Sequence, residues 1–198
     1  MQADIKISSF EEDGMAEIHL EVPFEDGEIE KLKSGDTVML SGTIYTARDA
    51  AHKRMTEQLD KGEELPVDLD GQVIYYVGPT PAKPGQAIGS AGPTTSSRMD
   101  AYTPALLERG LKGMIGKGYR SEEVIDSIRD NKAVYMVAIG GTGALLAQKI
   151  NSSELVAYEE LGTEAIRRLE VENFPCIVIH DSEGNDFYKS SQQSFSNN

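Results

Sequence analysis

Short apolar runs alternate with helix-like segments along this chain, and that alternation restricts the fold more than any other feature of the sequence. Strand-like runs lie in GQVIYYV, LKGMIGKG and KAVYMVAIGG, and the helical patterns MDAYTPALLERG and SEEVIDSIRD separate them. The strand-like segments MAEIHLEVPF and DTVMLSGTIYTA and the helical pattern ARDAAHKRMTEQLDKG precede these elements. Strands that alternate with helices pack as layers around a shared core. The sequence therefore predicts an α/β fold with a β-rich start.

Local signals define where several of these elements begin and end. Ser121 precedes a helical pattern with acids in its first turn and is the predicted N-cap, while Gly62 is the predicted C-cap of an earlier helix. Directly after a glycine pair, TGALLAQKI predicts a further helix. The proline- and glycine-rich segment from Pro79 to Arg98 lacks a regular pattern, and loops of this length are usually functional or disordered. Towards the end, PCIVIHDSEGNDFY predicts a β-hairpin with EGND as its turn.

The length of 198 residues suits one domain with a sizeable core. We expect a single domain over residues 1–189 and a flexible polar tail over residues 190–198. No apolar run approaches the roughly 18 residues of a membrane span, and the first residues lack the layout of a signal peptide. These features predict a cytoplasmic protein.

Charge restricts the class of partner. The chain has 33 acidic residues against 19 lysines and arginines, for a net charge of −14. Nucleic acids and anionic membranes require a basic face, so neither is expected as a partner. A small anion responds to the local potential of its pocket, so an anionic ligand is still compatible with this composition.

Cysteine and histidine do not form a metal site in this sequence. Cys176 is the only cysteine, so the chain cannot form an internal disulfide or hold a zinc or iron–sulfur site by itself. The apolar segment around it predicts a small buried side chain in a strand. His19, His52 and His180 are too far apart for a metal site and are interpreted as structural.

Two glycine-containing segments resemble nucleotide-binding motifs without matching them. AIGGTGALLAQ follows a predicted strand, but Leu146 occupies the third glycine position of the dinucleotide fingerprint. A tight strand-to-helix turn whose N–H groups face an anion is the favoured interpretation. MIGKGYRS lacks the glycine and the hydroxyl that a Walker motif requires. It places Lys117 at the end of a buried strand, where ligands of open α/β sheets bind.

Three cations lie where loops meet strand or helix ends: Arg48, Arg98 and Lys117. Arg98 ends the segment GPTTSSR, whose hydroxyl and N–H groups can form an anion cradle, although a serine-rich cap with a solvated arginine is the alternative. Arginine binds a carboxylate with two hydrogen bonds, whereas lysine acts as a point charge. This set suits a small di- or tricarboxylate better than a phosphate polymer.

At these residues the sequence resembles a known enzyme family. SGTIYTARDAAHKR, GSAGPTTSSRMDAY, MIGKGYRS, IGGTGALLAQ and EELGTEAIRRLEVENFPCIVIHDSEGNDFY are similar, in collinear order, to the β-subunit or C-terminal domain of iron–sulfur-dependent class I fumarases and L-tartrate dehydratases. The resemblance covers about residues 4–188. It implies a swivelling β/β/α domain with a mixed sheet and flanking helices.

The resemblance also implies a hydro-lyase that interconverts malate and fumarate in the tricarboxylic acid cycle. Arg48, Arg98 and Lys117 would bind the substrate carboxylates, and Thr94 matches the family's proton-abstracting hydroxyl. Lys117 is also a candidate catalytic residue. The family's four-iron, four-sulfur cluster is held by three cysteines of the other subunit or domain, and the single cysteine of this chain agrees with that arrangement. We therefore expect a hetero-oligomer with an α-subunit that carries the cluster.

Two alternatives remain open at this stage. An L-tartrate dehydratase, or another hydroxy-dicarboxylate dehydratase, would use the same residues on a different substrate. A ligand-binding or regulatory module without a cluster is the alternative from a different functional class.

Overall fold

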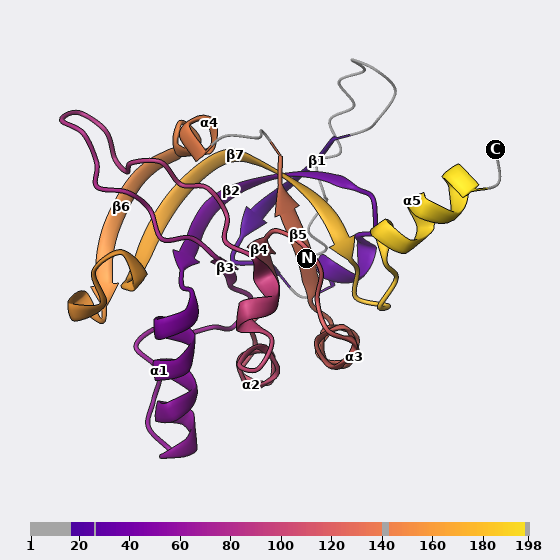
Figure 1. The fold of residues 1–198 in the computed structure, drawn as a ribbon, viewed down its shortest axis with the longest axis horizontal. Helices are drawn as coiled ribbons and strands as arrows, with labels where there is room; N and C mark the ends of the chain where they lie inside the picture. Colours follow the sequence, from indigo (N-terminus) through magenta and orange to yellow (C-terminus); the bar gives the residue numbers. More distant parts are fainter. Residues whose placement is uncertain (1–16, 26, 140–142, 197–198) are drawn as a thin grey trace.

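The computed structural model describes residues 17–25, 27–139 and 143–196. Its seven strands form one sheet in the order β1-β2-β3-β4-β5-β7-β6 (Figure 1). From β1 to β5, each pair of neighbouring strands is parallel. The strand β7 is antiparallel to β2, β5 and β6. Their bounds are β1 Glu17–Val22, β2 Thr37–Thr46, β3 Val73–Tyr75, β4 Gly113–Gly116, β5 Val134–Ala138, β6 Ile150–Ala157 and β7 Ile166–His180.

The sheet closes on itself because β7 is long enough to serve two neighbours. Its 15 residues pair with β2 from Thr37 to Thr46 and also with β5 and β6. The strands β2, β3, β4, β5 and β7 thereby form a closed, five-stranded arrangement. The predicted α/β fold, a swivelling β/β/α domain with a mixed sheet, is confirmed.

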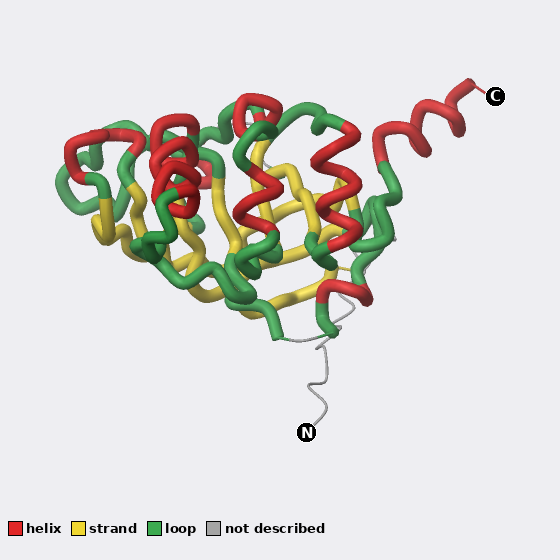
Figure 2. Tube along the Cα trace, turned by 90° about the horizontal axis from the view of Figure 1, so that it is seen from below, coloured by secondary structure: helices red, strands yellow, loops and turns green. Residues whose placement is uncertain are grey.

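Three helices cover one side of this sheet. In Figures 1 and 2, α1, α2 and α3 lie beside one another on the same side, and contacts join α1 to α2 and α2 to α3. The helices are α1 Asp49–Asp60, α2 Thr103–Leu107, α3 Glu122–Asp130, α4 Gly143–Ala147 and α5 Phe187–Ser196, with 3₁₀ turns η1 Ile29–Lys31, η2 Ser96–Met99 and η3 Glu159–Glu164.

The strand residues divide between two apolar clusters according to the alternation of a β-strand. Val73 and Tyr75 of β3 belong to the cluster enclosed by the strands, whereas Ile74 and Tyr76 belong to the cluster that packs against the helices. Both faces of β3 are therefore buried, which explains why its sequence is a continuous apolar run.

Most predicted boundaries agree with the structure. The Ser121 side chain accepts a hydrogen bond from Val124 N and caps α3, and Gly62 follows α1 with a positive φ of 72°. The helix predicted from Met99 is shorter than expected, because η2 and α2 replace one continuous helix. The glycine turn before α4 includes residues 140–142, which lie outside the described residues.

The predicted C-terminal hairpin is wrong. The strand β7 continues through Pro175 to His180, a single bridge joins His180 to Asp186, and α5 begins at Phe187. This helix extends into the segment predicted as a polar tail, and the domain boundary at residue 189 stays a prediction. Among the residues that the structure describes, no helix has the length and apolar character needed to cross a membrane.

Candidate active site

The carboxyl ends of the parallel strands β2, β3 and β4 lie at one edge of the sheet, and two of the predicted site residues follow these ends. Arg48 comes two residues after β2, and Lys117 comes directly after β4. Gly78 follows β3 and lies against Arg48: a Cβ atom placed on Gly78 would be 2.8 Å from Arg48 Nη1. The absence of a side chain at this position lets the arginine pack against the backbone.

The loop after β3 returns to the same edge and brings Thr94 towards Lys117. Thr94 N donates to the Tyr76 carbonyl at 2.7 Å, and Ser96 N donates to the Lys117 carbonyl at 2.9 Å. A parallel bridge also joins Thr95 to Lys117. Two N–H groups of the predicted anion cradle, those of Thr94 and Ser96, therefore already have backbone acceptors and are not available to an anion.

Arg48 and Arg98 meet at a carboxylate that the sequence analysis did not identify. Arg98 Nε and Nη2 bind the two oxygens of Asp49 at 2.8 and 2.7 Å, and Arg48 Nε lies 4.0 Å from Asp49 Oδ2. Arg48 Nη2 also pairs with Glu164 at 2.8 Å. Burial opposes ionisation of Glu164, but hydrogen bonds from Arg48 and Ala50 outweigh it and hold the pKa of this carboxyl below its usual value.

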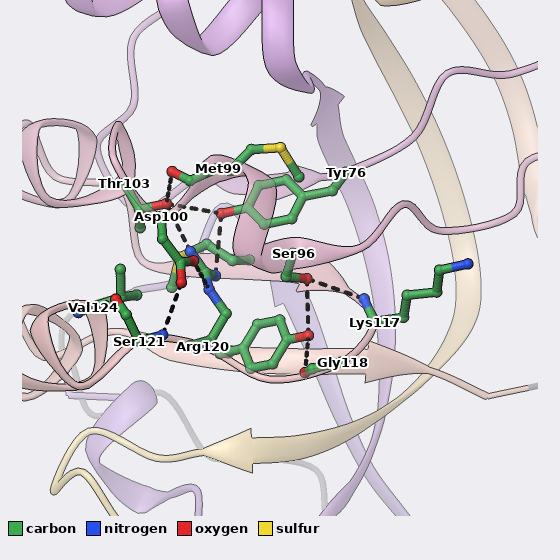
Figure 3. Close-up of polar contacts among 12 residues, drawn as sticks. Tyr76, Ser96, Met99, Asp100, Thr103, Lys117, Gly118, Arg120, Ser121 and Val124 are labelled. Carbon is green, nitrogen blue, oxygen red and sulfur yellow. Dashed lines mark hydrogen bonds and ion pairs between the residues drawn. The ribbon is translucent and has the colours of Figure 1, made fainter.

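Lys117 has an exposed side chain, as Arg98 does, but among the described residues it lacks the carboxylate partner that each arginine has. Within the described part of the chain, its ammonium group has no hydrogen-bond or ion-pair partner, and Figure 3 shows it extending away from the neighbouring polar cluster. Its backbone, in contrast, is fixed: Lys117 N donates to Ser96 Oγ at 3.1 Å. The residue therefore combines a fixed backbone with an available positive charge.

Two hydrogen bonds of the Tyr135 hydroxyl support this edge of the sheet. The Ser96 hydroxyl shares a hydrogen bond of 2.9 Å with the Tyr135 hydroxyl, and Tyr135 donates to the Gly118 carbonyl at 2.9 Å. A Cβ atom on Gly116 would lie 2.0 Å from Ser96 Oγ, so the close approach of these segments requires glycine there. These hydroxyls connect β5 to Gly118 directly and to Lys117 N through Ser96.

The side chain of Arg120 is fully buried and joins residues of η2, α2 and α3 behind this edge. Arg120 donates to Asp100 and to Thr103 Oγ, each at 2.7 Å, and lies over the rings of Tyr76 and Tyr135. Burial disfavours its charge, but Tyr76 and Asp100 favour it and the pKa of the guanidinium stays raised. Asp100 in turn accepts a hydrogen bond from Ser121 N at 2.8 Å, at the start of α3. This cluster fixes η2, α2 and α3 relative to the ends of β3 and β4.

His52 is a packing residue, as the sequence analysis expected. Its ring is fully buried against Tyr76, and its Nδ1 lies 3.0 Å from the Arg48 carbonyl, so this nitrogen donates. Burial lowers the pKa of His52 to about 4. His180 is also buried and stacks on Tyr135, in agreement with its structural interpretation.

The lowered pKa of His52 predicts a dependence of stability on pH. Because the unfolded chain binds the proton at the ordinary pKa of about 6.5, it takes up protons before the folded chain does as the pH falls. The neutral ring therefore contributes stability above pH 6.5, and lowering the pH to 5 should remove about 2 kcal/mol of it. We expect urea unfolding at several pH values to show this slope, and His52→Asn to reduce it. An equal slope in the variant would contradict the assignment.

The described residues offer no ligand set for a metal cluster. No group of three histidine, cysteine, aspartate or glutamate side chains in them could hold a metal ion. Cys176 lies in β7 with no exposed surface, and burial raises the pKa of its thiol, which disfavours the thiolate that metal ligation requires. The predicted buried cysteine is confirmed.

Comparison with known proteins identifies the family. A family model described as the C-terminus of fumarase matches residues 2–191. The chain belongs to this fumarase C-terminal family. It is 45% identical over 155 residues to the aerobic class I fumarate hydratase of Escherichia coli K12, and 41% identical over 159 residues to fumarate hydratase 2 of Leishmania major. These alignments cover 77% and 79% of this chain but 28% of each relative.

A relative of similar length has a different assigned substrate. The chain is 41% identical over 168 residues to a protein of Methanocaldococcus jannaschii assigned as the L(+)-tartrate dehydratase subunit beta, and the alignment covers 82% of this chain and 86% of that protein. The fumarase C-terminal family thus includes a separate β-subunit as well as parts of longer fumarate hydratases. The predicted resemblance is confirmed, and both named activities are those of hydro-lyases.

Sequence reasoning found the cations of this edge but not the residues that hold them. Asp49, Glu164, Ser96, Asp100 and Arg120 carry no distinct local pattern. The sequence offers one signal for these partners: each arginine has an aspartate close by in the sequence, Asp49 next to Arg48 and Asp100 two positions after Arg98. It did not indicate which carboxylate pairs with which arginine.

Proposed function

We propose that this chain is the β-subunit of a hydro-lyase that reversibly hydrates fumarate to malate together with an α-subunit. The observation that supports it most directly is the group of cations at one edge of the sheet within a fumarase C-terminal domain. Arg48 and Lys117 follow the ends of β2 and β4, and Arg98, in η2, shares the carboxylate of Asp49 with Arg48. The match to 86% of a protein assigned as a separate β-subunit supports a two-subunit enzyme. We also propose the cytoplasm as its compartment.

Each cation has a distinct part in binding a dicarboxylate. The contact with Asp49 involves Nε and Nη2 of Arg98, so it leaves the N–H groups on the Nη1 side unused. These groups can bind a second carboxylate with two hydrogen bonds. Lys117 supplies a positive charge without a competing anion among the described residues. Arg48 is more enclosed, with a side chain 25% exposed, and would contact a ligand at one side.

Thr94 is the proposed site of proton abstraction, and its placement is compatible with that role. Its backbone is fixed by the hydrogen bond to Tyr76, and its side chain is partly exposed. A hydroxyl acts as a base only where neighbouring charge favours its deprotonated form, and Lys117 is the neighbouring cation that can do so. The same cations would stabilise the negative charge that develops on the substrate carboxylate when the α-proton leaves.

The iron–sulfur cluster implied by the family does not fit the residues of this chain. The single cysteine is enclosed in β7, and no other ligand group exists among the described residues. We therefore assign the cluster to the α-subunit, where it would supply a Lewis acid for the hydroxyl group of the substrate. The contribution of this chain is restricted to binding and orienting the substrate and moving its proton.

A tartrate dehydratase is the second candidate. The β-subunit relative of Methanocaldococcus jannaschii favours it because that protein matches this chain over nearly its whole length. Tartrate carries the same two carboxylates as malate and one more hydroxyl group. The cations described above bind the shared carboxylates, so they do not separate these substrates.

Reconstitution tests the proposal. We expect hydratase activity to appear only when the chain is mixed under anaerobic conditions with a cluster-bearing class I α-subunit. Rates with malate, fumarate, tartrate and mesaconate on that complex would identify the substrate, and fumarate and malate should be the fastest. Full activity of this chain alone would contradict the two-subunit proposal. Binding of ligands without activity in the mixture would favour the cluster-free module.

A further inference from the structure

A carboxylate of this chain lies between the two arginines proposed to bind the substrate. Asp49 accepts one hydrogen bond from Arg98, from Nε to Oδ1 at 2.8 Å. Its Oδ2 forms an ion-pair contact of 2.7 Å with Arg98 Nη2 and lies 4.0 Å from Arg48 Nε. The contact to Arg98 joins residues 49 positions apart in the sequence. It joins η2, at the end of the loop after β3, to the start of α1.

The position of Asp49 is fixed by the backbone. It is the first residue of α1, a place where the helix dipole favours a negative charge. The next residue, Ala50, donates its N–H to Glu164 at 2.8 Å, which ties the start of the helix to η3. The short side chain of Asp49 reaches Arg98 from this rigid base, so it restricts the guanidinium rather than following it.

Whether Asp49 competes with a substrate carboxylate for Arg98 depends on which edge of the guanidinium it occupies. Asp49 binds the Nε–Nη2 edge and leaves the Nη1–Nη2 end, with three N–H groups, unused by that contact. The Arg98 side chain is 49% exposed, so this end is accessible. A substrate carboxylate can therefore bind Arg98 while Asp49 stays in place.

Two roles are conceivable for an aspartate on a substrate-binding arginine, and they predict opposite effects. A competitor would occupy the bidentate end and have to leave before the substrate binds, so its removal would improve binding. A positioning residue would hold the opposite edge and orient the free end, so its removal would weaken binding. The side-on geometry and the rigid helix start correspond to the second role.

We infer that Asp49 is a positioning residue that orients Arg98, and through it the substrate carboxylate, in the reconstituted hydro-lyase. This inference rests on the proposed function, because it assigns Arg98 to a bound dicarboxylate. Without the aspartate, the Arg98 side chain gains rotamer freedom, and each substrate-binding event must restrict it again.

The test is Asp49→Asn in the chain reconstituted with its α-subunit. Asparagine keeps the size and one acceptor oxygen but removes the negative charge and places an amide against the guanidinium, so the ion pair is lost. We expect the KM for fumarate and malate to rise and kcat/KM to fall about 10- to 100-fold, in the range that a small misplacement of a binding group produces. A KM that is unchanged or lower would overturn the inference.

Two controls separate orientation from a general structural effect. Glu160→Gln removes another carboxylate–arginine contact, the exposed pair with Arg54 at 2.6 Å, and should leave KM unchanged. In the Arg98→Lys background, adding Asp49→Asn should have little further effect, because the two residues act as one unit. Full additivity of the two substitutions would overturn the inference. An inactive wild-type complex would instead refute the proposed function, so the two failures are distinguishable.

Discussion

Replacing Arg120 with methionine should lower the free energy of unfolding by about 3–5 kcal/mol, the cost of breaking a buried ion pair. The Arg120 side chain has no exposed surface, and its removal takes donors from Asp100 and Thr103 and the cation from above Tyr76 and Tyr135. Asp100, whose side chain is 14% exposed, keeps the hydrogen bond from Ser121 N but loses its cationic partner, so its largely buried charge is left almost uncompensated.

Urea unfolding of the isolated chain measures this effect, and Arg129→Met is the matched control. Arg129 lies on α3 and pairs with Asp126 at 2.9 Å, but its side chain is 48% exposed, so its loss should change stability by less than about 0.5 kcal/mol. Adding Asp100→Asn to the Arg120 variant should restore part of the loss because no buried charge is then left unpaired. A variant of Arg120 as stable as that of Arg129 would show that the buried cluster does not support the fold.

The alternation of strands and helices was sufficient to predict the fold class because it is a local property. Each strand with both faces buried is a short apolar run, and α3 begins and ends where Ser121 and the apolar spacing indicate. Such signals act within a few residues, which is why they can be recognised in the sequence alone.

The closure of the sheet could not be predicted in the same way. The strand β7 pairs with β2 across more than 120 positions of sequence, and nothing local specifies that partner. Pro175 also interrupts the apparent strand pattern, since proline cannot donate to a ladder and usually marks the end or edge of a strand. Here the carbonyl of Pro175 accepts from Ile139 N at 2.9 Å, and the strand continues to His180. The predicted hairpin fails beyond that point, because a single bridge joins His180 to Asp186 and α5 begins at Phe187.

In the candidate site, too, the residues with a local sequence signal were predicted, and the residues that depend on distant contacts were not. Arg48, Arg98 and Lys117 were identified because each stands beside a strand or loop boundary in an acidic chain. Their partners were missed because 33 acidic residues make any single carboxylate uninformative, and Glu164 lies 116 positions from Arg48. A salt bridge across such a distance depends on the completed fold.

Replacing Arg98 with lysine should reduce kcat/KM of the reconstituted enzyme by about 100-fold or more, comparable to the loss of a group that stabilises developing charge. Lysine keeps the positive charge but has no planar fork, so it cannot bind the two oxygens of Asp49 and a substrate carboxylate at the same time. The loss should appear in kcat as well as in KM, because the proposed role includes stabilising the charge that forms when the α-proton leaves.

The comparison that isolates this effect is Arg54→Lys, made in the same complex. Arg54 forms a pair with Glu160 at 2.6 Å, and its side chain is 47% exposed, close to the 49% of Arg98. It lies in the middle of α1, whereas Arg98 contacts Asp49 at the start of that helix. If the number of positive charges alone determined the activity, both lysine variants would retain it. If the fork of Arg98 binds the substrate, only the Arg98 variant should lose turnover, and unchanged kinetics in that variant would remove Arg98 from the site.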